Sequence, residues 1–244
     1  MTLLLIATRN QHKVQEIRSI LADPFEYLTL VDFPDAPPVV EDAPDFAGNA
    51  TKKAATLADW LRQRRPSQGG TPHPRLFVLA DDSGLEVDAL GGAPGVHSAR
   101  FAALEATPAS GAKPARNAGN STDADNNAKL LRLLATTPHA QRTARFRCVL
   151  ALVQVQPAPP TAEARVFEGV CDGHIDVAPR GQGGFGYDPL FVPTGYDQSF
   201  AELGETVKNQ LSHRARALAK LRVWLTGVEK DLVPGIGLAG GVEG

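Results

Sequence analysis

The first third of the chain alternates short apolar runs with stretches of helical spacing. Residues 3–7 form a continuous apolar run, which is typical of a strand buried on both faces. Residues 14–21 repeat apolar side chains at helical spacing, residues 27–31 repeat the strand pattern, and residues 46–61 carry a second amphipathic helical pattern. A third apolar run covers residues 76–80. This order predicts the strand–helix units of an α/β protein.

The pattern changes in the second half of the chain. Residues 128–135 have helical spacing, whereas residues 143–155 and 164–175 alternate like two paired antiparallel strands. Residues 190–192 predict a short strand, and residues 207–225 predict one last helix. The sequence therefore predicts an α/β fold in which helices flank a twisted, mixed central β-sheet.

Three segments rich in Gly, Pro, Arg or Ala interrupt these elements, at residues 62–74, 106–120 and 157–160. Such residues favour turns, so we expect surface connections there. The pattern fades from Gly227 onward. A chain of 244 residues suits one large domain, and we expect that domain over residues 1–226 and a flexible C-terminal tail over 227–244.

Composition narrows the possible partners. The 25 Lys and Arg residues nearly balance 27 Asp and Glu residues, and 43% of the chain is hydrophobic. This composition excludes collagen-like, disordered and coiled-coil proteins. A formal charge of -2 offers no broad basic face to nucleic acid or an anionic membrane. We therefore expect a small-molecule partner, no nucleic acid and no membrane.

The apolar start of the chain and the small number of cysteines exclude further classes of protein. The apolar start of the chain meets Arg9 too early for a signal peptide or a membrane span, so the expected location is cytoplasmic. Cys148 and Cys171 are too few for a disulfide framework and lack the spacing of a zinc site. They are predicted to be buried thiols.

A polar cluster follows the first apolar run, where the first strand leads into the first helix. Backbone N–H groups at a helix start carry partial positive charge, and side chains of Thr, Asn and Lys there can help to hold a phosphate. The alternative is an ordinary polar connection. The cluster consists of Thr8, Arg9, Asn10, Gln11, His12 and Lys13.

Adjacent acids follow the third apolar run. Asp81 and Asp82 precede Ser83 and Gly84, which predicts a sharp turn with two carboxylates at the carboxyl end of a strand. Mg²⁺ prefers oxygen ligands and is usually held by one or two carboxylates together with substrate phosphates. The alternative is a solvated Asx turn that binds no metal.

Two charged residues lie elsewhere at positions that suit the same chemistry. Glu41 follows a proline-rich stretch and is a candidate for a second metal acid. Lys53 lies in the helical pattern of residues 46–61, and its ammonium group is suited to neutralise phosphate charge. The alternative for both residues is the solvated face of a helix or loop.

A glycine-rich segment over residues 181–188 carries Phe185 among small neighbours, which would let a nucleobase lie flat against the ring. Asp188, His213 and Arg214 offer an acceptor and donors for the edge of that base. The alternative places Phe185 in the core and makes His213 a capped residue on the surface.

Taken together, the clusters resemble the inosine triphosphate pyrophosphatase family, whose members hydrolyse non-standard purine nucleoside triphosphates to the monophosphate and pyrophosphate. The resemblance runs in order along almost the whole chain to about residue 225. Besides the clusters above, it is carried by Phe46, Asn49-Ala50, residues 91–100, Arg145-Phe146-Arg147-Cys148, Ala201-Glu202-Leu203, Lys208-Asn209 and Ser212-His213-Arg214.

The resemblance also implies a role for each cluster. Asp82 would be the general base and a metal ligand, with Glu41 as the second metal acid, and Lys13 and Lys53 would contact phosphate. The implied cofactor is Mg²⁺, the implied assembly is a homodimer, and the implied fold has two lobes with the active-site cleft between them. The implied substrate-binding positions are Thr8, Arg9, Asn10, Gln11, His12, Lys13, Ser83, Phe185, Gly186, Tyr187, Asp188, Lys208, His213 and Arg214.

The expected substrates are ITP, dITP and XTP, because their bases carry a 6-keto acceptor where adenine carries an amino donor. Two alternatives stay open: a protein that senses a nucleotide without cleaving it, and a pyrophosphatase for modified pyrimidine nucleotides. Asp81, Asp82 and Lys13 favour catalysis, since a sensor does not need to position water beside a metal.

Overall fold

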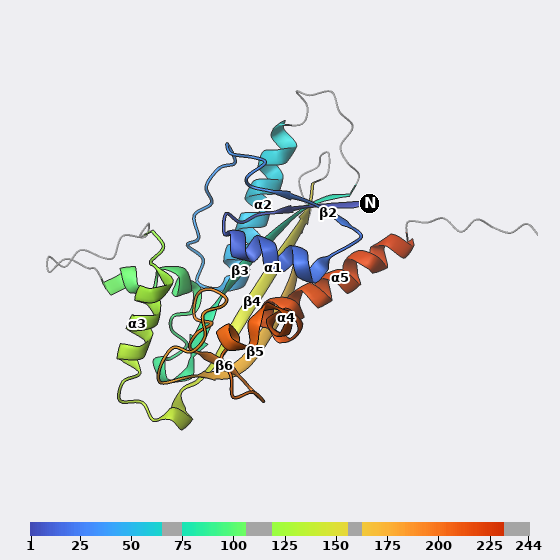
Figure 1. Ribbon diagram of the computed structural model, residues 1–244. Coiled ribbons are helices and arrows are strands. Elements are labelled where there is room, and N and C mark those ends of the chain that lie inside the picture. Colours follow the sequence, from blue (N-terminus) through green and yellow to red (C-terminus); the bar gives the residue numbers. More distant parts are fainter. Residues whose placement is uncertain (65–74, 106–118, 156–162, 232–244) are drawn as a thin grey trace, which may run out of the picture.

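The computed structural model describes residues 1–64, 75–105, 119–155 and 163–231 (Figure 1). The strands are β1 (Thr2–Ile6), β2 (Phe25–Thr29), β3 (Leu76–Val87), β4 (Thr143–Gln154), β5 (Arg165–Ile175) and β6 (Phe191–Pro193). The α-helices are α1 (Gln11–Leu21), α2 (Phe46–Arg64), α3 (Asp123–Leu133), α4 (Phe200–Leu211) and α5 (His213–Asp231). Short 3₁₀ helices cover Asp88–Leu90, Gly95–Arg100, Ala102–Glu105 and His139–Gln141.

The strands form one six-stranded sheet in the order β2-β1-β3-β4-β5-β6. β1 runs parallel to both β2 and β3, whereas β3, β4, β5 and β6 pair antiparallel in succession. The parallel pairs need crossover connections, and α1 and α2 supply them. The predicted α/β fold with a mixed sheet and flanking helices is confirmed.

The sheet separates two apolar layers, and β3 contributes to both because successive side chains of a strand point to opposite faces. Val78 and Ala80 pack with the apolar face of α2. Phe77 and Leu79 pack with α1 and α5 on the other face. Figure 1 shows α1 and α5 on the side of the sheet opposite to α2. The same alternation sends Asp81 and Asp82 to opposite faces.

The turn predicted over residues 81–84 is wrong, because β3 continues through both acids to Val87. The parallel pairing with β1 ends at Leu79, but β4 pairs with β3 along its whole remaining length. These antiparallel hydrogen bonds hold residues 81–84 extended. Gly84 serves close packing rather than a turn, since a Cβ there would lie 2.4 Å from the Ser98 hydroxyl and 2.5 Å from the Gly95 carbonyl oxygen.

The single helix predicted over residues 207–225 is two helices, α4 and α5, which meet at Ser212. Ser212 is extended, with φ -66° and ψ 164°, and its hydroxyl accepts a hydrogen bond from the backbone N–H of Ala215 at 3.2 Å. The break sets His213 and Arg214 in the first turn of α5. α5 extends to Asp231, past the position where the sequence predicts the tail to begin.

Several sequence predictions fall partly outside the described residues: positions 65–74 and 106–118 of two predicted loops, the connection at 157–160, and positions 232–244 of the tail. Cys148 and Cys171 are free and buried, as predicted. None of the helices in the described ranges combines the length and the apolar character that a membrane crossing requires.

Candidate active site

The loop between β1 and α1 is shaped by its own polar side chains. Asn10 caps α1, because its Oδ1 accepts the backbone N–H of Lys13 at 3.2 Å, and the Thr8 hydroxyl accepts the backbone N–H of Asn10 at 3.2 Å. Arg9 turns away and donates to the carbonyl oxygen of Ala36 at 3.2 Å. Gln11 is exposed at the start of α1. The start of α1 is thus capped by Asn10, and the anion-binding role expected for this loop stays a prediction.

One pocket, with a volume of about 150 Å³, brings most of the predicted positions together. Its lining comes from the start of α1, from β3, β4, α3, α4 and α5, from the 3₁₀ helix Gly95–Arg100 and from the segment before β6. The predicted residues in that lining are Asn10, Lys13, Ser83, Phe185, Gly186, Tyr187, Asp188, Lys208, His213 and Arg214. Those that sequence reasoning did not assign include Gly84, Ser98, Asp123, Asn126 and Phe146.

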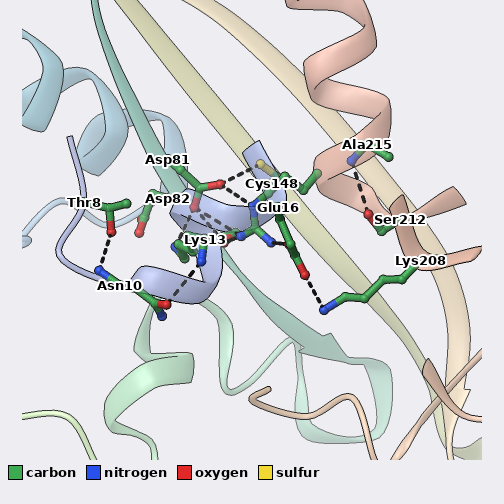
Figure 2. A network of polar contacts seen from close by, with 12 residues as sticks. Thr8, Asn10, Lys13, Glu16, Asp81, Asp82, Cys148, Lys208, Ser212 and Ala215 are labelled. Carbon is green, nitrogen blue, oxygen red and sulfur yellow. Dashed lines mark hydrogen bonds and ion pairs between the residues drawn. The ribbon is translucent and has the colours of Figure 1, made fainter. Parts of the chain in front are cut away.

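Asp81 is the centre of a buried ionic network on the face of β3 that packs against α1 and α5 (Figure 2). Lys13 Nζ lies 2.5 Å from Asp81 Oδ1, and Arg214 Nε donates to Oδ2 at 2.9 Å. The hydroxyl of Ser83 and the thiol of Cys148 donate to the same carboxylate at 2.9 and 3.3 Å. Burial alone would raise the pKa of Asp81, but Arg214 and Lys13 hold it well below its usual range.

Asp82 has a different environment on the opposite face. Lys53 Nζ lies 3.3 Å from Asp82 Oδ1, 3.2 Å from Glu41 Oε1 and 2.8 Å from the carbonyl oxygen of Asp81. Burial and the nearby charge of Glu41 raise the pKa of Asp82, although Lys53 and Lys13 oppose that shift. Burial lowers the pKa of Lys53, but the carboxylates of Asp82 and Glu41 raise it by more, so the ammonium stays charged.

The acids near Lys53 fit a divalent cation. Asp82 Oδ2 is buried and has no hydrogen-bond partner among the described residues, so one carboxylate oxygen is available for a ligand. Glu41 lies beside the same ammonium group and keeps a third of its side chain exposed. The described part of the chain holds no group of three or more His, Cys, Asp or Glu side chains arranged for a metal. Asp82 and Glu41 are therefore the residues that could hold a divalent cation, and its remaining ligands would have to come from waters and substrate oxygens.

The segment before β6 forms the other end of the pocket. Asp188 is buried, and its Oδ2 accepts the backbone N–H of Phe185 at 2.9 Å and lies 2.5 Å from Lys208 Nζ. Gly184 has φ +74°, and a Cβ there would lie 2.1 Å from Asp188 Oδ2. A side chain at position 184 would therefore disturb the contacts of the Asp188 carboxylate with Phe185 and Lys208. Burial raises the pKa of Asp188, although Lys208 opposes the shift.

His213 and Arg214 both line the pocket, but their environments differ. His213 is buried and stacks on Phe146 at 4.7 Å, and burial together with the charge of Arg214 holds the pKa of its imidazole well below its usual range. Its Nδ1 has no partner within the described residues. Arg214 is 1% exposed and is bound to Asp81, Glu16 and Ser83. His213 is thus a neutral group with an open ring nitrogen, whereas Arg214 is held by protein oxygens.

Two further residues of this site have no role assigned from the sequence: Glu16, and Asn49, which is named only as part of the resemblance. Glu16 lies one helical turn after Lys13, contacts Arg214, and lies 2.7 Å from Lys208 Nζ. Asn49 is fully buried at the start of α2. The spacing of Glu16 from Lys13 was a usable signal, because residues three apart share a helix face. The polar Asn49 inside an otherwise apolar helical stripe was another.

Asn49 connects the segment that carries Glu41 to the carboxyl group of Asp82. Its Oδ1 accepts the backbone N–H of Ala43 at 2.9 Å. Its amide lowers the pKa of Asp82, and its Nδ2 has no hydrogen-bond partner among the described residues.

The sequence pattern of the Ham1 family matches residues 4–224, which include all the residues of the candidate site. The chain belongs to the Ham1 family. It is 47% identical over 219 residues to a dITP/XTP pyrophosphatase of Geobacillus kaustophilus, covering 89% of this chain and 91% of that protein. It is 44% identical over 223 residues to a dITP/XTP pyrophosphatase of Geobacter sulfurreducens, covering 91% and 96%.

Solved structures of Ham1 proteins agree with the fold. A HAM1 protein from Coxiella burnetii aligns with a TM-score of 0.71 at 34% identity, covering 93% of this chain and 100% of that one. The resemblance to inosine triphosphate pyrophosphatases is therefore confirmed at the level of the family. The individual site residues stay predictions.

Proposed function

We propose that this chain hydrolyses the non-standard purine nucleoside triphosphates dITP, XTP and ITP to the nucleoside monophosphate and pyrophosphate. Its relatives named dITP/XTP pyrophosphatase support this function. The observation that carries it is the arrangement around residues 81–82. Lys13 lines the pocket and contacts Asp81, while the adjacent Asp82 keeps one buried carboxylate oxygen unpaired. Asp82 does not itself line the pocket, but the charge of Lys13 opposes the rise that burial causes in its pKa, so a cation suited to phosphate acts on an available base.

In the proposed reaction, Lys13 and the start of α1 bind the triphosphate, and the charged Lys53 lies beside the acids. Asp82 and Glu41 would hold Mg²⁺, which withdraws charge from the phosphates when bound. The raised pKa of Asp82 brings it closer to the range of a general base. Asp82 orients a water and accepts its proton as the water oxygen bonds to the α-phosphorus. The bond from that phosphorus to the bridging oxygen breaks, and pyrophosphate leaves.

The other end of the pocket would select the base. Phe185 offers a ring face, and Lys208, His213 and Arg214 bring N–H groups to the same pocket. A 6-keto oxygen accepts from such donors, whereas the 6-amino group of adenine presents hydrogens to them and leaves them unpaired. This difference disfavours ATP. A Mg²⁺ cofactor, a homodimer and a cytoplasmic location complete the proposal, and the homodimer rests on the resemblance alone.

A turnover assay tests the proposal with dITP, ITP, XTP, GTP, ATP and dUTP, with and without Mg²⁺, and with separate detection of pyrophosphate and orthophosphate. We expect Mg²⁺-dependent pyrophosphate release from dITP, ITP and XTP and little from GTP or ATP. Release of orthophosphate, or tight nucleotide binding without turnover, would refute the reaction assigned to Asp82. Preference for dUTP would refute the purine assignment.

A further inference from the structure

His12 lies in the predicted phosphate loop but faces away from the pocket that its neighbours line. Asn10 and Lys13 line the main pocket, whereas His12 lines a second cavity of about 170 Å³. Phe185 borders both cavities. The imidazole of His12 stacks on the Phe185 ring, with ring centroids 5.2 Å apart and planes 14° from parallel. The side chain is therefore placed against an aromatic ring rather than toward a phosphate.

The segment around Phe185 is fixed mainly through its backbone. The backbone N–H of Phe185 donates to Asp188, and the backbone N–H of Gly186 donates to Asp123 Oδ2 at 2.6 Å. Asn127 donates to the carbonyl oxygen of Gly186 at 3.0 Å. None of these three bonds restrains rotation of the Phe185 side chain, and both flanking glycines have positive φ.

Contacts to the Phe185 ring itself come from three side chains. Lys208 Nζ lies 4.4 Å from the ring centroid, and the central carbon of the Arg214 guanidinium lies 6.0 Å from it. Both cations also hold buried carboxylates. Among the described residues, His12 is the aromatic partner of this ring, and its near-parallel plane would set the ring's orientation.

We propose that His12 is a positioning residue for base recognition: it supports the Phe185 ring from the second cavity, so that the ring is held ready for a nucleobase in the main pocket. This inference rests on the proposed function, because it takes Phe185 as the base-stacking side chain. It also gives the loop after β1 two roles, with Asn10 and Lys13 on the phosphate side and His12 on the base side.

Calorimetric binding of two probes tests the proposal. IMP reports on the base end of the pocket, and pyrophosphate reports on the phosphate end. Stacked aromatic pairs contribute about 0.5–1.5 kcal/mol, so we expect His12→Ala to weaken IMP binding about two- to twelvefold. Pyrophosphate binding should stay within about twofold of wild type, and His12→Phe should restore most of the IMP affinity because it restores a stacked ring.

The matched control is Gln15→Ala. Gln15 lies one turn further along α1, is exposed, and lines the same second cavity, but it has no ring to stack. This variant should bind IMP like wild type. In a Phe185→Ala background, His12→Ala should cause no further loss, since the ring that it supports is already absent.

The outcomes separate this inference from the proposed function. The inference would be overturned if His12→Ala lost affinity for pyrophosphate while its affinity for IMP stayed unchanged or was not restored by His12→Phe. His12 would then belong to the phosphate site. An additive loss in the Phe185→Ala background would overturn it as well. The wild-type chain and the His12 variants could differ in IMP affinity as expected while the wild-type chain releases no pyrophosphate from dITP. The proposed function would then fail and the positioning role of His12 would stand.

Discussion

The two faces of β3 place neighbouring carboxylates in opposite conditions. On the face toward α1 and α5, Asp81 is bound by Lys13, Arg214, Ser83 and Cys148, and its pKa is held well below the usual range. On the face toward α2, Asp82 contacts Lys53 through one oxygen, keeps the other unpaired, and has a raised pKa. Both groups are almost fully buried.

Burial alone therefore does not determine whether a carboxyl group can bind a cation or accept a proton. A fully paired carboxylate has a low affinity for protons and fixes its cationic partners, so Asp81 serves the structure of the site. An incompletely paired carboxylate remains free to bind a cation or to accept a proton, so Asp82 is suited to chemistry.

The largest effect is expected for Asp82→Asn. Loss of the base and of a ligand oxygen should lower kcat by about 10³-fold or more, in the range found when central catalytic groups are removed. Thermal melting should show equal or higher stability at neutral pH, because an acid with a raised folded pKa destabilises the fold when ionised. The difference in stability between Asp82→Asn and the wild type should narrow as the pH falls through the raised pKa of Asp82. Near-normal pyrophosphate release would remove Asp82 from catalysis.

Asp81→Asn should mainly affect stability. It leaves Lys13 and Arg214 without a buried counter-charge, and breaking such a pair costs about 3–5 kcal/mol of unfolding free energy. Urea titration measures this loss, with Asp82→Asn as the control for an amide at the adjacent position. The pKa of Asp81 is lowered in the fold, so its contribution is present at neutral pH and is lost only as the pH falls below its usual value of 3.8. Equal free energies of unfolding for Asp81→Asn and Asp82→Asn would refute the structural role assigned to Asp81.

Asn49→Ala should reduce turnover about 10–100-fold, as is usual for residues that orient ligands or catalytic groups. The variant removes both the hydrogen bond to Ala43 and the amide near Asp82. Asn49→Asp keeps the acceptor for Ala43 but brings a second negative charge toward Asp82. If Asn49 acts on Asp82, both variants lose activity; if it only anchors the Ala43 segment, Asn49→Asp stays close to wild type. Steady-state kinetics over a range of Mg²⁺ concentrations distinguishes the two.

The smallest effect is expected at Cys148. Its thiol donates to Asp81, so Cys148→Ala should cost about 1 kcal/mol, whereas Cys148→Ser retains a donor and should cost less. Burial, with the nearby charge of Asp81, raises the pKa of this thiol well above its usual range. A thiol reagent should therefore react with native protein far more slowly than with protein in urea. Rapid modification of the native thiol would mean that this side of β3 opens easily.

Local patterns predicted most of the fold, with small shifts in position. The strand expected at residues 27–31 lies at Phe25–Thr29, and the apolar run at residues 164–175 corresponds to Arg165–Ile175. The predictions failed at residues 81–84 and at Ser212, where short-range patterns favour a turn and a continuous helix. At the first position the pairing with β4 decides the conformation, and at the second the hydroxyl of Ser212 caps a new helix.

The order of strands and helices and the polar clusters between them can be predicted from the amino-acid sequence, and so can the resemblance that joins these clusters into one family. How the clusters combine depends on the folded chain: Asp81 contacts Arg214, which lies 133 positions away, and His12 contacts Phe185 rather than facing the main pocket. The physical reason is that periodicity reports which face of an element is buried. The partner that covers that face, and therefore the charge environment of each buried group, is set by strand pairing and by packing between distant segments.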